Sequence, residues 1–242
     1  GNDLLVTAAV ENTYLHSETR REYDSWASEA AGAIGAVASA FGPAYTLATG
    51  QEAEFELKGG RAAGASSQAL RDTLFSGAGN NVLLAGEGVT LEAGEYKGDN
   101  LFISSGLNAG SIAETQILGL QTTNSRYNTE TNHLFGQTQG FASLSTRATE
   151  EKARHRTSTR WHGTAINITD DVSINSAGKM ILQGATVEAG GDIGLAAGAI
   201  EFTAGRSSTS YGDNLSSDAN LGEYQETQRS SSRSFAEVTS LS

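Results

Sequence analysis

The sequence contains no cysteine and a single proline, Pro43, among 242 residues. The lack of cysteine excludes disulfide frameworks and thiolate chemistry. Hydrophobic residues make up 38% and aromatic residues 7%, which is little for one compact globule of this length. The alanine-rich stretch 28–41, in which Glu29 is the only charged residue, is shorter than the about 20 residues that a membrane-spanning helix needs. The composition therefore favours an extended fold with a narrow core.

Cationic residues are scarce as well. Lys and Arg number 16 against 28 Asp and Glu, which gives a formal net charge of −12. Binding to nucleic acid needs a cationic surface that releases phosphate counterions, so we expect no nucleic-acid partner. The four histidines stand singly and match no metal-ligand spacing: His16, His133, His155 and His162. We therefore expect neither a metal site nor another cofactor.

Catalytic patterns are missing too. Asp170 and Asp171 would be the carboxylate pair of a carbohydrate-active β-helix enzyme. Adjacent residues on a strand point to opposite faces, however, so we interpret Asp171 as a turn residue equivalent to Asp192. No phosphate-binding loop or nucleophile elbow is present. We expect a protein that is not an enzyme, and the carbohydrate-active enzyme is the least favoured alternative.

Short strands with inward-pointing aliphatic pairs recur between glycines, of which there are 29. In each pair the first and third residues of a strand point inward. Two stretches, 82–106 and 172–198, share this plan. Its pairs are Val82/Leu84, Val89/Leu91, Leu101/Ile103, Val172/Ile174, Met180/Leu182, Ile193/Leu195 and Ile200/Phe202, with Tyr96 and Val187 as single inward residues. Three such strands make one turn of about 20 residues, which predicts an all-β, parallel β-solenoid.

Long polar excursions interrupt the solenoid. Three strands lead into them, and each is followed by a tyrosine: Tyr14, Tyr127 and Tyr211. We expect residues 1–242 to form a single β-solenoid segment of a longer protein, with excursions at about 10–75, 122–163 and 206–242. The third excursion is rich in serine and is predicted to be mobile or weakly strand-like.

The first excursion contains an alanine-rich stretch, 28–41, followed by Gly42 and Pro43. Because Pro43 cannot continue a helix, the stretch is predicted to be one short helix, or a hairpin, packed along the solenoid. Membrane insertion and disorder are the alternatives. The residues that would pack or insert are Trp26, Ile34, Val37 and Phe41.

The second excursion carries a basic segment in an otherwise acidic chain. Alternation around Arg154 and Arg156 predicts a strand of a hairpin lying against the solenoid. Its candidate interaction surface consists of Arg147, Lys152, Arg154, Arg156, Arg160 and Trp161. This surface would bind an anionic glycan or lipid headgroup, with the tryptophan stacking on a sugar ring. Alternatively, it is a solvated edge whose charge is balanced by Glu150 and Glu151.

Three units resemble the haemagglutinin repeats of filamentous-haemagglutinin-type exoproteins, a group that includes the stalk proteins of contact-dependent growth inhibition. They are Asp192–Gly198, Gly88–Gly94 and the exit Leu118–Tyr127. The resemblance implies a right-handed parallel β-helix, which is also the hand favoured for parallel crossovers. It further implies two-partner secretion through an outer-membrane transporter and display at the cell surface of a Gram-negative bacterium.

The resemblance makes a structural stalk segment the expected function, in an adhesin or a toxin-delivery exoprotein. The segment would assist toxin translocation into target cells, with a toxin or other domains in the same polypeptide. The alternative is an adhesion module whose excursions bind a glycan, a receptor or another component of the target-cell envelope.

Overall fold

The computed structural model describes residues 3–23, 54–71, 73–108, 110, 112–137, 145–219 and 224–242. The described part of the chain is all-β and contains no helix. The stretch 28–41, predicted to be a helix or hairpin, lies outside the described residues, as do Trp26, Ile34, Val37 and Phe41. No helix among the described residues is long and apolar enough to cross a membrane.

Two parallel sheets form a stack of coils, here called the rod. The first sheet has five strands, in the order β1 (Leu4–Thr7), β5 (Val89–Glu92), β7 (Thr115–Leu118), β12 (Lys179–Gln183) and β15 (Ala199–Thr203). The second has seven strands, in the order β14 (Ile193–Ala196), β11 (Val172–Ser176), β6 (Gly94–Ser105), β10 (Ala165–Ile168), β13 (Thr186–Ala189) and β18 (Ser240–Leu241), with β4 (Thr73–Leu84) also paired to β6. Each coil therefore adds one parallel strand to the five-stranded sheet, and two short strands or one long strand to the seven-stranded sheet.

Each complete coil passes through three strand positions. β6 supplies two of them, because its first half pairs with β10 and its second half with β11. The chain then returns to the five-stranded sheet, where β7 pairs with β5 in parallel. The pair Val172/Ile174 lies in parallel register with Ile193/Leu195. This winding is compatible with a β-helix and follows the three-strand turn that the sequence predicts.

Aliphatic side chains from successive coils stack into columns inside the rod. One column joins Leu91, Ile117 and Leu182, none of which is exposed to solvent. A second column contains Tyr96, which is equally buried. Burying such side chains contributes about 1.5–3 kcal/mol each, so these columns hold the coils together. At the end of the stack, Phe202 of β15 is 52% exposed because no described strand covers it.

One strand has the opposite register from that predicted. Val82 and Leu84, expected to point inward, are 52% and 53% exposed, whereas Leu83 between them is 8% exposed. Leu83 pairs with Ile103 of β6, which is fully buried. Three consecutive aliphatic residues carry no alternation of their own, and pairing with β6 decides which one enters the core. A register shift between Gly77 and Asn80 precedes this part of β4.

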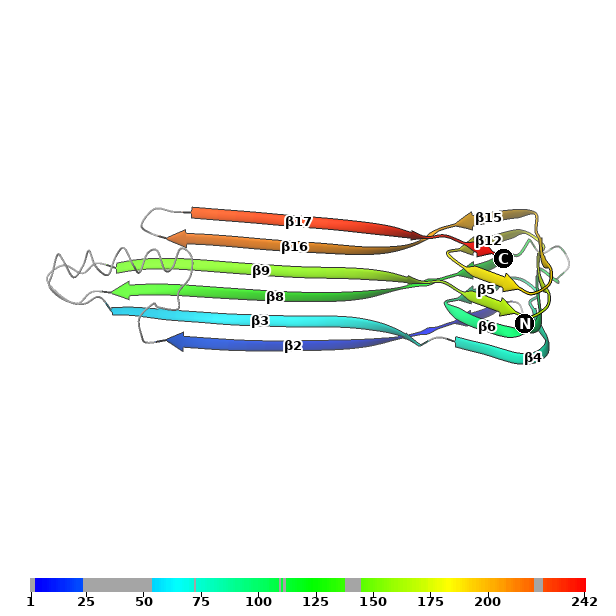
Figure 1. The fold of residues 1–242 in the computed structure, drawn as a ribbon, viewed down its shortest axis with the longest axis horizontal. Coiled ribbons are helices and arrows are strands. Elements are labelled where there is room, and N and C mark those ends of the chain that lie inside the picture. The colour runs from blue at the N-terminus through cyan, green and yellow to red at the C-terminus, as the bar shows by residue number, and fades with distance from the viewer. Residues whose placement is uncertain are drawn as a thin grey trace.

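The excursions form a third sheet of six antiparallel strands, here called the hairpin sheet (Figure 1). Its strands are β2 (Ala9–Tyr23) with β3 (Glu54–Arg71), β8 (Leu120–Gln137) with β9 (Ser145–His162), and β16 (Gly205–Ala219) with β17 (Tyr224–Glu237). The sheet extends away from the rod. The prediction that the second hairpin lies against the rod is therefore wrong. The third hairpin is not weakly strand-like either, because β16 pairs along its length with both β17 and β9.

The hairpins leave the rod at every second coil. They follow β1, β7 and β15, the first, third and fifth strands of the five-stranded sheet. In the two intervening coils the same corner is turned by a single residue with left-handed backbone geometry, Ala93 at φ 48° and Gly184 at φ 51°. A hairpin is two strands wide, about 9.6 Å, and two coils rise by the same distance. Hairpins on alternate coils can therefore pair edge to edge, as β3 does with β8 and β9 with β16.

Side chains also join the coils at their corners. Asp171 accepts a hydrogen bond from the backbone N–H of Asp192 at 2.8 Å, one coil further on. The N–H of Asp171 in turn donates to Oδ1 of Asn100 at 3.1 Å. This ladder uses Asp171 as a turn residue.

Candidate binding face of the hairpin sheet

One row of side chains crosses five strands of the hairpin sheet and comes from all three hairpins. Direct cross-strand partners in an antiparallel sheet share a face, so the members of this row point to the same side. The row consists of Leu15, Ala65, Arg126, Arg156 and Tyr211. None of these hairpins could form the row alone.

The row lines an open groove, here called the arginine groove, with a volume of about 620 Å³. Ala63 and Ala65 of β3 place only methyl groups on this face, which leaves room between the larger residues on β2 and β8. Tyr211, 39% exposed, and Leu15, 68% exposed, add apolar surface at the two sides. The groove therefore combines an apolar lining with guanidinium groups.

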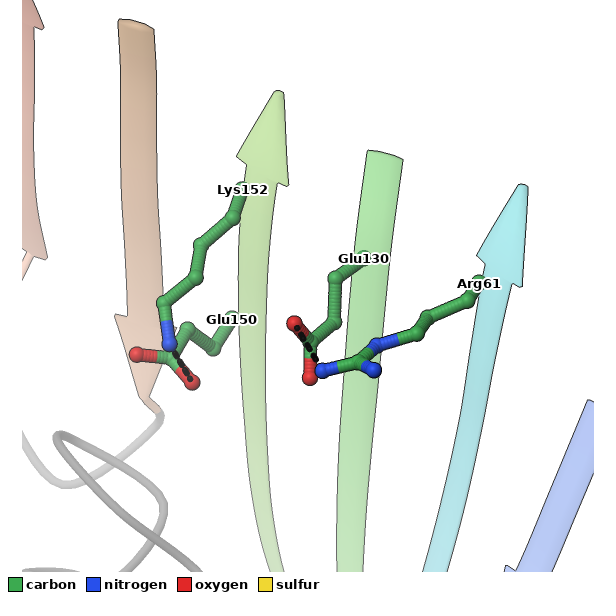
Figure 2. A network of polar contacts seen from close by, with 4 residues as sticks. All are labelled: Arg61, Glu130, Glu150 and Lys152. Carbon is green, nitrogen blue, oxygen red and sulfur yellow. Dashed lines mark hydrogen bonds and ion pairs between the residues drawn. The ribbon is translucent and has the colours of Figure 1, made fainter. Parts of the chain in front are cut away.

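Toward the far end of the hairpins, the charges on this face are paired (Figure 2). Arg61 of β3 forms a salt bridge of 3.2 Å with Glu130 of β8, and Lys152 of β9 forms one of 3.4 Å with Glu150. Glu150 is 6% exposed, so its carboxylate depends on this partner.

The groove itself has a different charge arrangement. Arg154, at its margin, forms a salt bridge of 3.3 Å with Asp213. Arg126 and Arg156 are exposed and lie directly opposite each other on β8 and β9. Neither forms a salt bridge with a described residue, so two like charges stand side by side without a counterion. Such a pair is destabilising in a sheet unless an anion neutralises it.

The opposite face carries an aromatic row. Nδ1 of His16 and the hydroxyl of Tyr127 form a hydrogen bond of 2.8 Å between the first and second hairpins. The ring of Tyr127 lies where a Cβ on Gly64 would be, and the ring of His155 lies where a Cβ on Gly212 would be. These glycines let the rings lie flat against neighbouring strands, so the row joins the hairpins mechanically.

The residues predicted from sequence as an interaction surface lie at different places. Lys152 and Arg154 are occupied by the salt bridges just described, whereas Arg156 is in the groove. Arg147 lies further out on β9, opposite Phe135. Arg160 is exposed near the rod.

Trp161 lies at the junction of the rod and the hairpin sheet. Its Nε1 donates to the carbonyl oxygen of Gly184 at 3.4 Å. The indole ring occupies the space beside Gly119 and Gly205, where a Cβ would collide with it. The contacts on this ring thus fix the base of the second and third hairpins to the rod.

Sequence reasoning missed Arg126 as a partner of Arg156. The two residues are far apart in the sequence and are joined only by the register of β8 and β9. Tyr211 follows a strand exit in the sequence, but its position beside Arg156 depends on the pairing of β16 with β9.

Other candidate chemistry is limited among the described residues. No group of three His, Cys, Asp or Glu side chains is placed to hold a metal ion in the part of the chain that the structure describes. In the rod, burial raises the pKa of Tyr96 to about 12. Its hydroxyl has no hydrogen-bond partner among the described residues, and its surroundings are the aliphatic core.

Comparison with known families gives one match. Residues 144–231 match the family model described as hemagglutinin repeat. The matched region runs from the start of β9 through β16 into β17, and it includes the unit 192–198, whereas 88–94 and 118–127 lie outside it. No curated protein and no solved structure matches the chain. The region 144–231 is thus similar to hemagglutinin repeats, a structural and adhesin family, and this similarity suggests a segment of a filamentous-haemagglutinin-like adhesin or exoprotein.

Proposed function

We propose that this chain is a stalk segment of a secreted, surface-displayed bacterial exoprotein, wound as a right-handed β-helix. The observation that carries the proposal is the alternation of hairpin-bearing and hairpin-free coils, because it lets three hairpins pair into one sheet. A bare stack of coils resists bending only through its narrow core. A sheet fixed along the side of the stack broadens its cross-section, which stiffens it, and stiffness is what a stalk needs.

The arrangement also suits extension by repetition. Each pair of coils adds one hairpin, and the pairing of β3 with β8 is repeated by β9 with β16. Stability in such architectures is roughly a sum of nearest-neighbour terms, so length can grow without a new core. The acidic, cysteine-free composition fits a protein that crosses an envelope before it folds.

Immunogold labelling of the producing bacterium tests the stalk proposal. Antibodies raised against this chain should label intact cells along surface filaments, and labelling should disappear when the adjacent transporter gene of the two-partner secretion type is deleted. Label confined to the cytoplasm, or surface label independent of a transporter, would contradict the proposal.

We further propose that the segment belongs to a toxin-delivery exoprotein and assists translocation into target cells, where an envelope component is its partner. The test uses the full exoprotein with residues 88–178 removed, which deletes two coils with the middle hairpin and leaves the first and third hairpins on alternate coils. Continued surface display with lost inhibition of neighbouring cells is the expected outcome. Unchanged inhibition at equal display would end the translocation role.

A further inference from the structure

We propose that the arginine groove is a binding site for an acidic polysaccharide, with Arg126 and Arg156 holding the anionic groups and Tyr211 and Leu15 contacting sugar rings. The inference goes beyond the structural role of the stalk, because it assigns recognition to one face of the hairpin sheet. It rests on the register of that face and on the charges that the fold leaves without partners.

The first step concerns electrostatics. Cross-strand partners have Cβ atoms about 4.5–5.5 Å apart, so the guanidinium groups of Arg126 and Arg156 can reach one anionic group together. Arginine forms paired, charge-assisted hydrogen bonds with carboxylates and similar oxyanions. The neighbouring cations Arg61, Lys152 and Arg154 already have carboxylate partners. Of the three arginines that line the groove, Arg126 and Arg156 are therefore the two without a carboxylate partner among the described residues, and they can bind an external anion.

The second step concerns the apolar lining. A small inorganic anion needs no such surface, whereas a sugar ring has an apolar face that packs on aromatic and aliphatic side chains. Tyr211 lies next to Arg156, and Leu15 lies two strands from Arg126, across Ala65. The row spans four strand spacings, about 19 Å, which suits several linked sugars better than one ion.

The third step separates a sugar chain from a peptide strand. Peptides commonly bind sheets by adding a strand to an open edge. Ala65, Arg126 and Arg156 lie on β3, β8 and β9, which are interior strands whose backbone groups pair on both sides. A ligand in the groove can therefore meet only side chains, and side-chain contacts of this kind favour an anionic sugar polymer.

The net charge of the chain makes the proposal specific. At a formal charge of −12, the protein as a whole repels polyanions, so general electrostatic attraction does not account for binding. Any binding must come from a local site. Because the net negative charge disfavours nonspecific binding of polyanions, a titration with a polyanion reports on the local site.

The test is a titration of the full 242-residue chain with chondroitin sulfate fragments, followed by isothermal calorimetry. Saturable binding is expected, with at least about a tenfold loss in Arg126→Gln/Arg156→Gln and a several-fold loss in Tyr211→Ser. The matched control, Arg20→Gln/Arg71→Gln, removes the same charge from arginines that pair with Glu18 and Glu11. It should bind like the unmodified chain.

Each other outcome overturns the proposal or one named part of it. No saturable binding, or equal losses in both double variants, would refute the groove as a site. Equal affinity for polyglutamate of the same charge would refute recognition of sugar rings and leave an acidic peptide as the ligand. Binding of neutral dextran would refute the role of the arginines. Arg156→Gln alone removes the like-charge contact, so its unchanged or higher Tm shows that a loss of binding is not a loss of folding.

Discussion

Tyr127 of the second hairpin lies flat over Gly64 of the first hairpin, in the space that a Cβ of Gly64 would occupy. The two residues are direct cross-strand partners. The tyrosine hydroxyl continues across β3 to His16 on β2. The glycine thus allows one aromatic side chain to join three strands of the hairpin sheet.

Gly64→Ala should therefore destabilise the contact between the first two hairpins. The added methyl group displaces the Tyr127 ring and the hydrogen bond to His16. The control is Gly60→Ala, whose Cβ would meet only the carbonyl oxygen of Thr19 at 3.8 Å. Because alanine is better than glycine in a strand by about 0.5–1 kcal/mol, the control should be stabilised.

Denaturant unfolding measures both variants. Gly64→Ala should be less stable than Gly60→Ala by about 1–2 kcal/mol, from the lost hydrogen bond and packing. Equal stabilities would show that the ring of Tyr127 does not hold the hairpins together.

The inverted register of β4 gives a second prediction. Leu83→Ala should lower the free energy of unfolding by about 2–5 kcal/mol, because Leu83 packs in the core. Leu84→Ala, one residue away, removes an exposed side chain and should change it by less than about 0.5 kcal/mol. Thermal unfolding of the pair distinguishes the two registers. A larger loss for Leu84→Ala would restore the alternation predicted from sequence.

Alkaline pH should destabilise the rod through Tyr96. Its pKa is about 12 in the folded chain against 10.0 for the ordinary side chain. Below pH 10 both states hold the proton, but between pH 10 and about 12 the unfolded state loses it first, so stability falls as pH rises.

Tyr96→Phe should remove this loss. It also removes a buried hydroxyl that has no hydrogen-bond partner among the described residues, so Tm at neutral pH should stay the same or rise. Urea unfolding at several alkaline pH values, with tyrosinate absorbance as the readout, checks both effects. An identical pH slope in Tyr96→Phe would assign the loss to other groups.

The position of each hairpin in its sheet predicts unequal effects of deletion. Removing 120–162, the middle hairpin, leaves a gap two strands wide between β3 and β16. These two strands are then about 10 Å further apart than the spacing of hydrogen-bonded neighbours. The remaining hairpins are then isolated, and isolated hairpins are marginally stable. Removing 206–237 instead leaves four paired strands.

Amide hydrogen exchange measures the difference. Protection of β2 and β3 should fall strongly after the first deletion and little after the second. Similar protection of β2 and β3 in the two variants would mean that the hairpins do not support one another.

Much of the rod follows from the sequence. Val172, Ile174, Met180 and Leu182 alternate with outward residues between glycines, and each is buried as this pattern predicts. The pattern predicts burial correctly because each short strand of a solenoid faces the core on one side and solvent on the other, so apolar and polar residues alternate along it. It fails at Leu83, where a run of aliphatic residues lets the neighbouring coil choose the register.

The hairpin sheet could not be predicted in the same way. Its strands are polar on both faces, so no apolar alternation marks their register. The meeting of Arg126 with Arg156 depends instead on the turn between β8 and β9, and that of Arg156 with Tyr211 on the spacing of alternate coils. The basic segment predicted part of the groove, and the partners from other hairpins came only from the structure.

Disulfide trapping tests the central claim most directly, since the chain has no cysteine of its own. Ser66 and Ser125 face each other between the first and second hairpins with their Oγ atoms 2.6 Å apart, and Thr159 and Ser208 do so between the second and third at 2.7 Å. Ser66→Cys/Ser125→Cys and Thr159→Cys/Ser208→Cys should each form an intramolecular disulfide readily, whereas Ser66→Cys/Ser208→Cys should remain reduced. Bridging of that last pair, or none in the first two, would contradict hairpins joined in one sheet at alternate coils.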